Sequence, residues 1–171
     1  MKKCLILILL LTSFATVAQR KYSIVKVIDQ LRIQWDEAAI ALKDYQGIQN
    51  FCASDNYKEE TISLLDAIHH WDTTLYYIVQ NKYEETGDPE AAITLQDIEK
   101  LETEYSTQNF KLFITNECNI IQEIEDSFES KTIKKHEKDI KVFEKELIKY
   151  LNSITYRVDI IDEHIHHLDL D

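Results

Sequence analysis

Near the end of the chain, acidic and histidine side chains recur at the spacing of one helix face. They lie at positions i, i+3, i+4 and i+7 and are Asp159, Asp162, Glu163 and His166. Carboxylate oxygens and imidazole nitrogens bind divalent cations, and this spacing places them on one stripe of a helix. The sequence therefore marks a candidate divalent-metal site on this stripe. A solvated helix flank without a metal is the simpler interpretation, and it is the one that we favour.

A second acid–histidine pair, Asp66 and His69, has the same three-residue spacing as Glu163 and His166. Carboxylate-bridged di-metal bundles use a comparable pair, Glu-x-x-His, on each of two helices. Here the further bridging glutamates have no counterpart. In an antiparallel register the two pairs also lie ~10 Å apart along the helix axis. A shared di-metal core is therefore not expected.

Other familiar functional motifs are absent from the sequence. It contains no Cys-x-x-Cys-His for covalent haem, no Gly-rich phosphate loop, no Gly-x-Ser-x-Gly elbow and no His-Glu-x-x-His zinc signature. The sequence thus indicates neither catalytic residues nor a cofactor beyond the divalent metal considered above. We expect a protein that is not an enzyme.

The first residues, Met1 to Ala18, have the composition of a secretory signal peptide. Lys2 and Lys3 give a positive start, an apolar run follows, and Thr16-Val17-Ala18 is a small-residue cleavage site. The apolar run is shorter than a membrane span requires. The sequence therefore predicts a signal peptide over residues 1–18 and one domain over residues 19–171. The mature protein would be periplasmic or secreted, with no membrane span after cleavage.

The chain is strongly acidic, with 19 basic and 31 acidic residues and a formal net charge of −12. Loss of Lys2 and Lys3 with the signal peptide leaves 17 basic residues and a net charge of −14. Such a surface repels nucleic acid and anionic membranes, which argues against both as partners. It suits a basic extracytoplasmic protein or cations, whereas charge kept for solubility is the alternative.

Two cysteines, Cys52 and Cys118, remain after cleavage. The helix register places Cys118 level with about position 56, beside the connection that holds Cys52. An even number of cysteines in an exported chain favours a bridge. We therefore predict a Cys52–Cys118 disulfide, with two free thiols as the alternative.

Two glycines, one proline and long apolar seams at three- and four-residue spacing indicate an all-α fold. The seams run through Ile24, Ile28, Leu31, Trp35, Ala38, Leu42 and Tyr45, through Leu64, Ile68, Trp71, Leu75 and Ile78, and through Ile140, Phe143, Leu147, Tyr150, Ile154, Val158, Ile161, Ile165 and Leu168. We predict an up-and-down four-helix bundle with long antiparallel, coiled-coil-like helices. The four expected helices span Tyr22–Asn50, Tyr57–Thr86, Pro89 to a turn near Ser130, and Lys131–Leu168. One continuous helix from Pro89 to Leu168 is the alternative for the last two. Asn56, with Glu59 three residues on, is the expected cap of the second helix. Gly87-Asp88-Pro89 should end the second helix and begin the third.

The third predicted helix contains a slip of its apolar pattern at Ser106–Asn109. We favour a stutter within one helix, and a break at Ser106 that makes five helices is the alternative. The second hairpin should exceed the first by ~10 residues, or ~15 Å. The overshooting part, Gln122–Asp139, would project from the body, and its polar tip around Ser127–Asp139 is a candidate recognition surface, with a solvated hairpin end as the alternative.

The sequence favours a non-enzymatic exported protein that binds another extracytoplasmic protein through an acidic surface or the projecting tip. A divalent-metal-binding bundle is the alternative function, and a ligand pocket between helices is a third.

Overall fold

The structure is a computed structural model that describes residues 23–125 and 130–167, and it is all-α over these residues. The predicted signal peptide, residues 1–18, lies outside them. The first helix covers residues 23–42. The later helices are α2 (Tyr45–Ala53), α3 (Asp55–Thr86), α4 (Pro89–Tyr105), α5 (Thr107–Glu125) and α6 (Ser130–His167). None of the described helices is long and apolar enough to cross a membrane.

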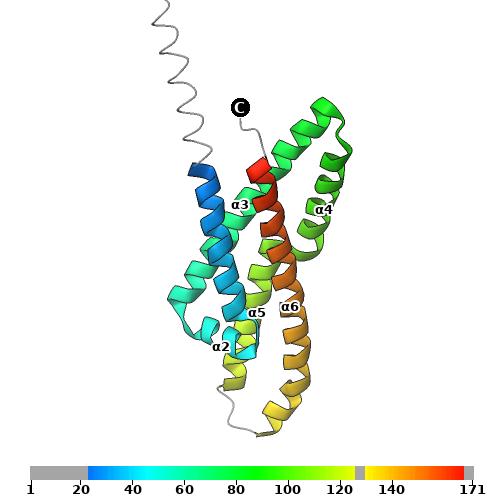
Figure 1. The fold of residues 1–171 in the computed structure, drawn as a ribbon. Coiled ribbons are helices and arrows are strands. Elements are labelled where there is room, and N and C mark those ends of the chain that lie inside the picture. Colours follow the sequence, from blue (N-terminus) through cyan, green and yellow to red (C-terminus); the bar gives the residue numbers. More distant parts are fainter. Residues whose placement is uncertain (1–22, 126–129, 168–171) are drawn as a thin grey trace, which may run out of the picture.

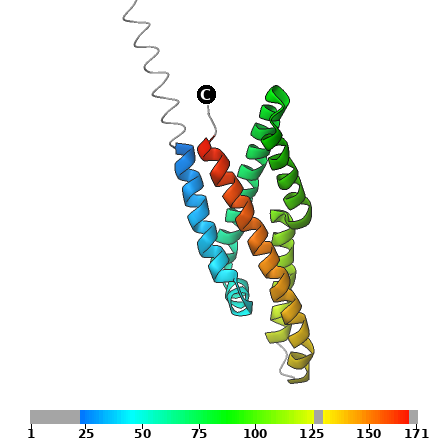
Figure 2. The ribbon, with the colours of Figure 1, turned by 45° about the vertical axis from the view of Figure 1, so that its right-hand side comes forward.

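The path of the chain is visible in Figure 1. Helix 23–42 descends to α2, α3 climbs back, α4 and α5 descend one after the other, and α6 rises beside them. The joined ends of α5 and α6 project below α2 in both views, and the α3–α4 hairpin projects at the opposite end (Figures 1 and 2). α5 and α6 pack against each other, so they are two separate helices. Residues 126–129, between the two helices in sequence, lie outside the described residues.

Apart from the half-buried Ile24, Ile140 and Tyr150, the described residues that the periodicity predicts in helix 23–42 and α6 are buried. In the first helix these are Ile28, Leu31, Trp35, Ala38 and Leu42. In α6 they include Phe143, Leu147, Ile154, Val158, Ile161 and Ile165. A helix of this kind gains most of its stability from covering such a stripe.

The first helix is shorter than predicted, because it ends at residue 42 and not at Asn50. Asp44 then caps α2, its Oδ1 accepting the Gly47 N–H at 2.9 Å. The turn is so tight that a Cβ on Gly47 would lie 1.9 Å from the carbonyl oxygen of Ala41. Glycine is therefore required at this position, and the predicted helix breaks at residues 43 and 44, just before α2.

The start of α3 also differs from the prediction. Ser54 is the N-cap, and its Oγ accepts the Tyr57 N–H at 3.3 Å. Asn56 and Glu59, predicted as cap and capping box, lie within the helix. Ser54, in extended conformation directly before Asp55, caps the helix two residues earlier than predicted.

The turn at Gly87 is confirmed. Gly87 adopts a left-handed conformation (φ 66°) and its N–H donates to the carbonyl oxygen of Tyr83. Asp88 caps α4, accepting the Glu90 N–H at 3.0 Å, and Pro89 occupies the first helical turn.

The uninterrupted third helix is wrong, and the alternative break at Ser106 is what the structure has. Ser106 is buried, and its Oγ accepts the Asn109 N–H at 3.0 Å while its carbonyl oxygen accepts the Phe110 N–H. A side-chain cap thus ends one helix and begins the next, and it resets the phase of the apolar pattern.

The predicted disulfide is confirmed: Cys52 of α2 and Cys118 of α5 are bonded, 66 residues apart in sequence. The bond joins the short helix α2 to α5, and these two helices also pack against each other.

Gly47→Ala should lower the free energy of unfolding by roughly 3 kcal/mol, because the new methyl group collides with backbone that cannot yield cheaply. Gly87→Ala is the matched control. A Cβ there meets nothing within 4 Å, and only the left-handed backbone is strained, at about 1 kcal/mol. Urea unfolding measures both changes. A smaller loss for Gly47→Ala than for Gly87→Ala would contradict the tight turn.

Candidate functional site

The acidic stripe on α6 is only partly assembled into a site. Nδ1 of His166 lies 3.4 Å from Oδ1 of Asp162, and Nε2 lies 3.7 Å from Oδ1 of Asp29 on the first helix. Asp29, Asp162 and His166 are the only group in the described chain that brings three metal-ligand atoms within 4.8 Å of one another. Asp159 and Glu163 are not part of it. Asp29 was not among the predicted ligands because it comes from another helix.

A guanidinium group already lies at this cluster. Nη1 of Arg32 donates to Oδ2 of Asp162 at 2.9 Å, and Nε lies 4.0 Å from Oδ1 of Asp159. Arg32 therefore neutralises part of the acidic charge near the end of α6, where acids oppose the helix dipole. Any bound cation would share Asp162 with it.

The two acid–histidine pairs belong to different parts of the molecule. Asp66 pairs with Lys111 of α5, with Nζ and Oδ1 2.6 Å apart. His69 lies at a pocket between α3 and α4. The Asp66–His69 pair is therefore not joined to the cluster at His166, as the register predicted.

A buried ion network crosses the core between α3, α4 and α6. Arg157 of α6 is 1% exposed and Asp72 of α3 is 3% exposed. Nε of Arg157 lies 3.3 Å from Oδ2 of Asp72, and Nη1 donates to Oε2 of Glu102 on α4 at 2.9 Å. Oδ1 of Asp72 and Nη2 of Arg157 have no hydrogen-bond partner within the described residues. Charges this deeply buried are stable only when paired.

The electrostatics of this network depend on burial first. Desolvation raises the pKa of Asp72 to about 6, against the opposing effect of Arg157, with Glu102 raising it and His69 lowering it. The carboxyl group is thus poised to change charge near neutrality. The carboxyl group of Asp72 can hold or release a proton, and its Oδ1 can accept a hydrogen bond.

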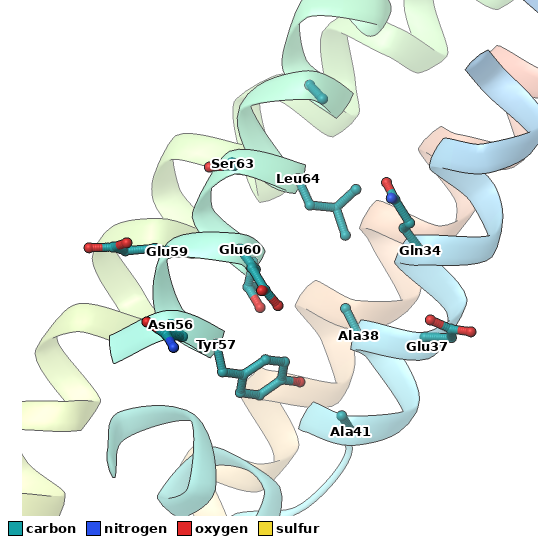
Figure 3. A pocket seen from close by; sticks show the side chains of 12 residues that line it. Gln34, Glu37, Ala38, Ala41, Asn56, Tyr57, Glu59, Glu60, Ser63 and Leu64 are labelled. Atoms are coloured by element: carbon teal, nitrogen blue, oxygen red, sulfur yellow. The ribbon is translucent and has the colours of Figure 1, made fainter. Parts of the chain in front are cut away.

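Two of the grooves on the surface have an acidic rim. The larger, about 970 Å³, lies between helix 23–42 and α3. Ala38 and Ala41 face Tyr57 and Leu64 across it, and Ala67 completes the apolar lining (Figure 3). We call it the alanine groove.

The second groove, about 470 Å³, lies between α5 and α6 toward their projecting end. Phe113 and Phe143 stack beside it, with ring centres 5.3 Å apart. Burial raises the pKa of Glu117 there, and the nearby Asp139 adds to the shift. Glu123, Ile124 and Asp139 of the predicted projecting part line this groove. Residues 126–129 of that part lie outside the described residues.

The predicted core face of α3 is confirmed in part, and the ion network was missed. Ile68 and Leu75 of the predicted seam are buried, whereas Leu64, Trp71 and Ile78 are half-buried. The other members of the buried row are Thr61, Leu65, Asp72 and Val79. The signal was present: Asp72 and Arg157 are opposite charges that both stand at core spacing in their helices.

The chain matches no protein-family model, and comparisons with curated proteins and with solved structures find no match either. Function therefore rests on the geometry of the chain itself.

Arg157→Met should destabilise the protein by about 3–5 kcal/mol at pH 8, since Asp72 is left buried without its cation. Arg157 lowers the pKa of Asp72, so its loss raises that pKa further above the unfolded value of 3.8. A carboxyl with a raised folded-state pKa costs the folded state more as pH rises through the interval between the two values. The loss should therefore be smaller near pH 5 than at pH 8.

Urea unfolding at several pH values measures this dependence. Arg157→Met/Asp72→Leu, which removes both charges, is the control and should recover most of the loss at pH 8. An equal loss at every pH would contradict the pairing.

Proposed function

We propose that the protein is an exported, non-enzymatic helical protein that binds a basic amphipathic helix of another extracytoplasmic protein in the alanine groove. In this proposal the fold is an up-and-down four-helix bundle whose third limb is divided into α4 and α5. The single observation that carries the proposal is the groove between helix 23–42 and α3, with its volume of about 970 Å³.

The floor of the groove supports a helical occupant. Ala38, Ala41 and Ala67 are small, so they allow the backbone of a bound helix to approach closely. Tyr57 and Leu64 point toward the first helix and offer apolar contact surface (Figure 3). A helix whose apolar face lies in a hydrophobic groove is a recurring mode of recognition.

The rim supports a basic occupant. Glu37, Glu59 and Glu60 line the groove, and no lysine or arginine is among its lining residues. Lysines on the polar face of a bound helix would meet these carboxylates, while the net charge of the chain attracts a basic partner from a distance. The acidic groove between α5 and α6 is a weaker candidate, since Lys149 pairs with Glu146 of its rim at 2.6 Å.

The experiment compares Glu37→Lys/Glu60→Lys with Glu85→Lys/Glu137→Lys, a control with the same charge change at exposed positions outside the groove. The probe is a synthetic amphipathic helix of about four turns with lysines on its polar face. We expect the groove variant to weaken binding roughly tenfold, and the control about threefold or less. Fluorescence anisotropy measures the affinity.

The same variants, made in the chain from Gln19 onward, can be immobilised and exposed to extracytoplasmic extract. A partner that the control retains and the groove variant loses would carry the proposal to a natural protein. Equal weakening of the peptide by both variants would refute the groove as the site.

Divalent-metal binding is a second candidate, favoured by the three ligand atoms of Asp29, Asp162 and His166. Oδ1 of Asp162 is buried and has no hydrogen-bond partner in the described part of the chain. A cation between these groups would supply one.

For this candidate, Zn²⁺ titration by calorimetry should show weaker binding in His166→Ala. Arg32→Ala should bind more tightly, because it frees Asp162 from the competing guanidinium. His70→Ala, an exposed histidine elsewhere, is the control and should leave the affinity unchanged. Retention of full affinity by His166→Ala would eliminate this site.

A further inference from the structure

A pocket of about 470 Å³ lies between α3 and α4, separate from the alanine groove. The residues that matter for its chemistry are His69, Asp72, Tyr76, Tyr77, Glu99 and Glu102. Its size is within the range of small-molecule sites.

Asp72 lines this pocket although only 3% of the residue is exposed. Its Oδ2 faces Arg157, whereas Oδ1 has no hydrogen-bond partner among the described residues. Nδ1 of His69, in the same pocket, is likewise buried without a partner there. Unsatisfied buried acceptors are costly, so a ligand that donates to Oδ1 would recover free energy.

The charges around the pocket favour a cation. Asp72, Glu99 and Glu102 line it, and the lining contains no lysine or arginine. Arg157 stands behind Asp72 and bonds to Glu102, so it offsets one of the three carboxylates. Each ionised carboxylate left over attracts a positive ligand.

Two tyrosines of α3 also line the pocket. Tyr76 is held in place because its hydroxyl donates to Oε1 of Glu99 at 2.8 Å, and the ring of Tyr77 packs edge-on against it at 5.9 Å. Tyrosine faces bind hydrocarbon and attract ammonium groups.

A metal ion is a poor fit to the same residues. Within the described chain only Asp29, Asp162 and His166 bring three ligand atoms within 4.8 Å, so His69, Asp72 and Glu102 do not converge on one point. A longer molecule with a positive end fits donors that are spread along a pocket.

The geometry points to a small organic ammonium ion as the ligand of this pocket, its N–H groups donating to Oδ1 of Asp72 and its hydrocarbon part lying against Tyr76 and Tyr77. Binding requires the ionised carboxylate. The groups that face Asp72 are Arg157 from α6, Glu102 from α4 and His69 from its own helix. Because burial raises the pKa of Asp72 to about 6, affinity should fall as the pH drops below that value.

The test titrates phenethylammonium into the full mature chain and follows amide chemical shifts by NMR, with 2-phenylethanol as the uncharged analogue. We expect shifts confined to α3 and α4, and affinity at least roughly tenfold higher for the ammonium than for the alcohol. Asp72→Asn should abolish that preference. Asp36→Asn, the same charge change at an exposed position of the first helix, is the matched control and should retain it.

Tyr77→Ala keeps the test decisive if Asp72→Asn fails to fold, because Tyr77 is 60% exposed and its removal leaves the core intact. It should weaken the ammonium severalfold while Asp36→Asn does not. Equal affinity for the ammonium and the alcohol, no saturable shifts with either, or an unaffected Tyr77→Ala would overturn the inference. The alanine-groove variant Glu37→Lys/Glu60→Lys should not change binding of the ammonium ion. The two proposals can therefore fail independently.

Discussion

Burial of the apolar seam of α6 is the constraint on which the rest of the structure depends. A helix of 38 residues cannot cover such a seam by itself, so other helices must surround it. α3, α4 and α5 all pack against α6. The first helix reaches it through Trp35, whose Nε1 donates to Oγ1 of Thr155 at 2.9 Å.

The same arrangement brings charge into the core. Arg157 stands on α6 between Ile154 and Ile161, so packing of the seam carries its guanidinium inward together with the apolar side chains. Asp72 and Glu102 come from the two helices that cover this part of α6. The network couples three helices at one level, and its Asp72 also lines the α3–α4 pocket. A polar pocket is thus a consequence of how the core is closed.

Local signals explain where the helices end. Gly87 followed by Asp88 and Pro89 is a strong signal, because each residue suits only its own position in the turn. The breaks just before Gly47 and at Ser106 rest on weaker signals. A glycine or serine inside a regular apolar pattern is tolerated in many helices, so the pattern alone favours continuity. Only the close approach to Ala41 and the buried cap at Ser106 show that the chain turns there.

The sequence by itself determined the all-α class, the buried rows of helix 23–42 and α6, the turn at Gly87 and the Cys52–Cys118 pairing. These follow from periodicity and register, which are properties of one helix or of neighbouring helices of known length. Tertiary structure decided which residues of α3 are buried together with Ile68 and Leu75. The predicted neighbours and the observed ones both have helical spacing, so only the packing partners distinguish them. It also decided that Asp29 joins Asp162 and His166, and that Asp72 meets Arg157. Side chains far apart in sequence converge only when the helices are packed.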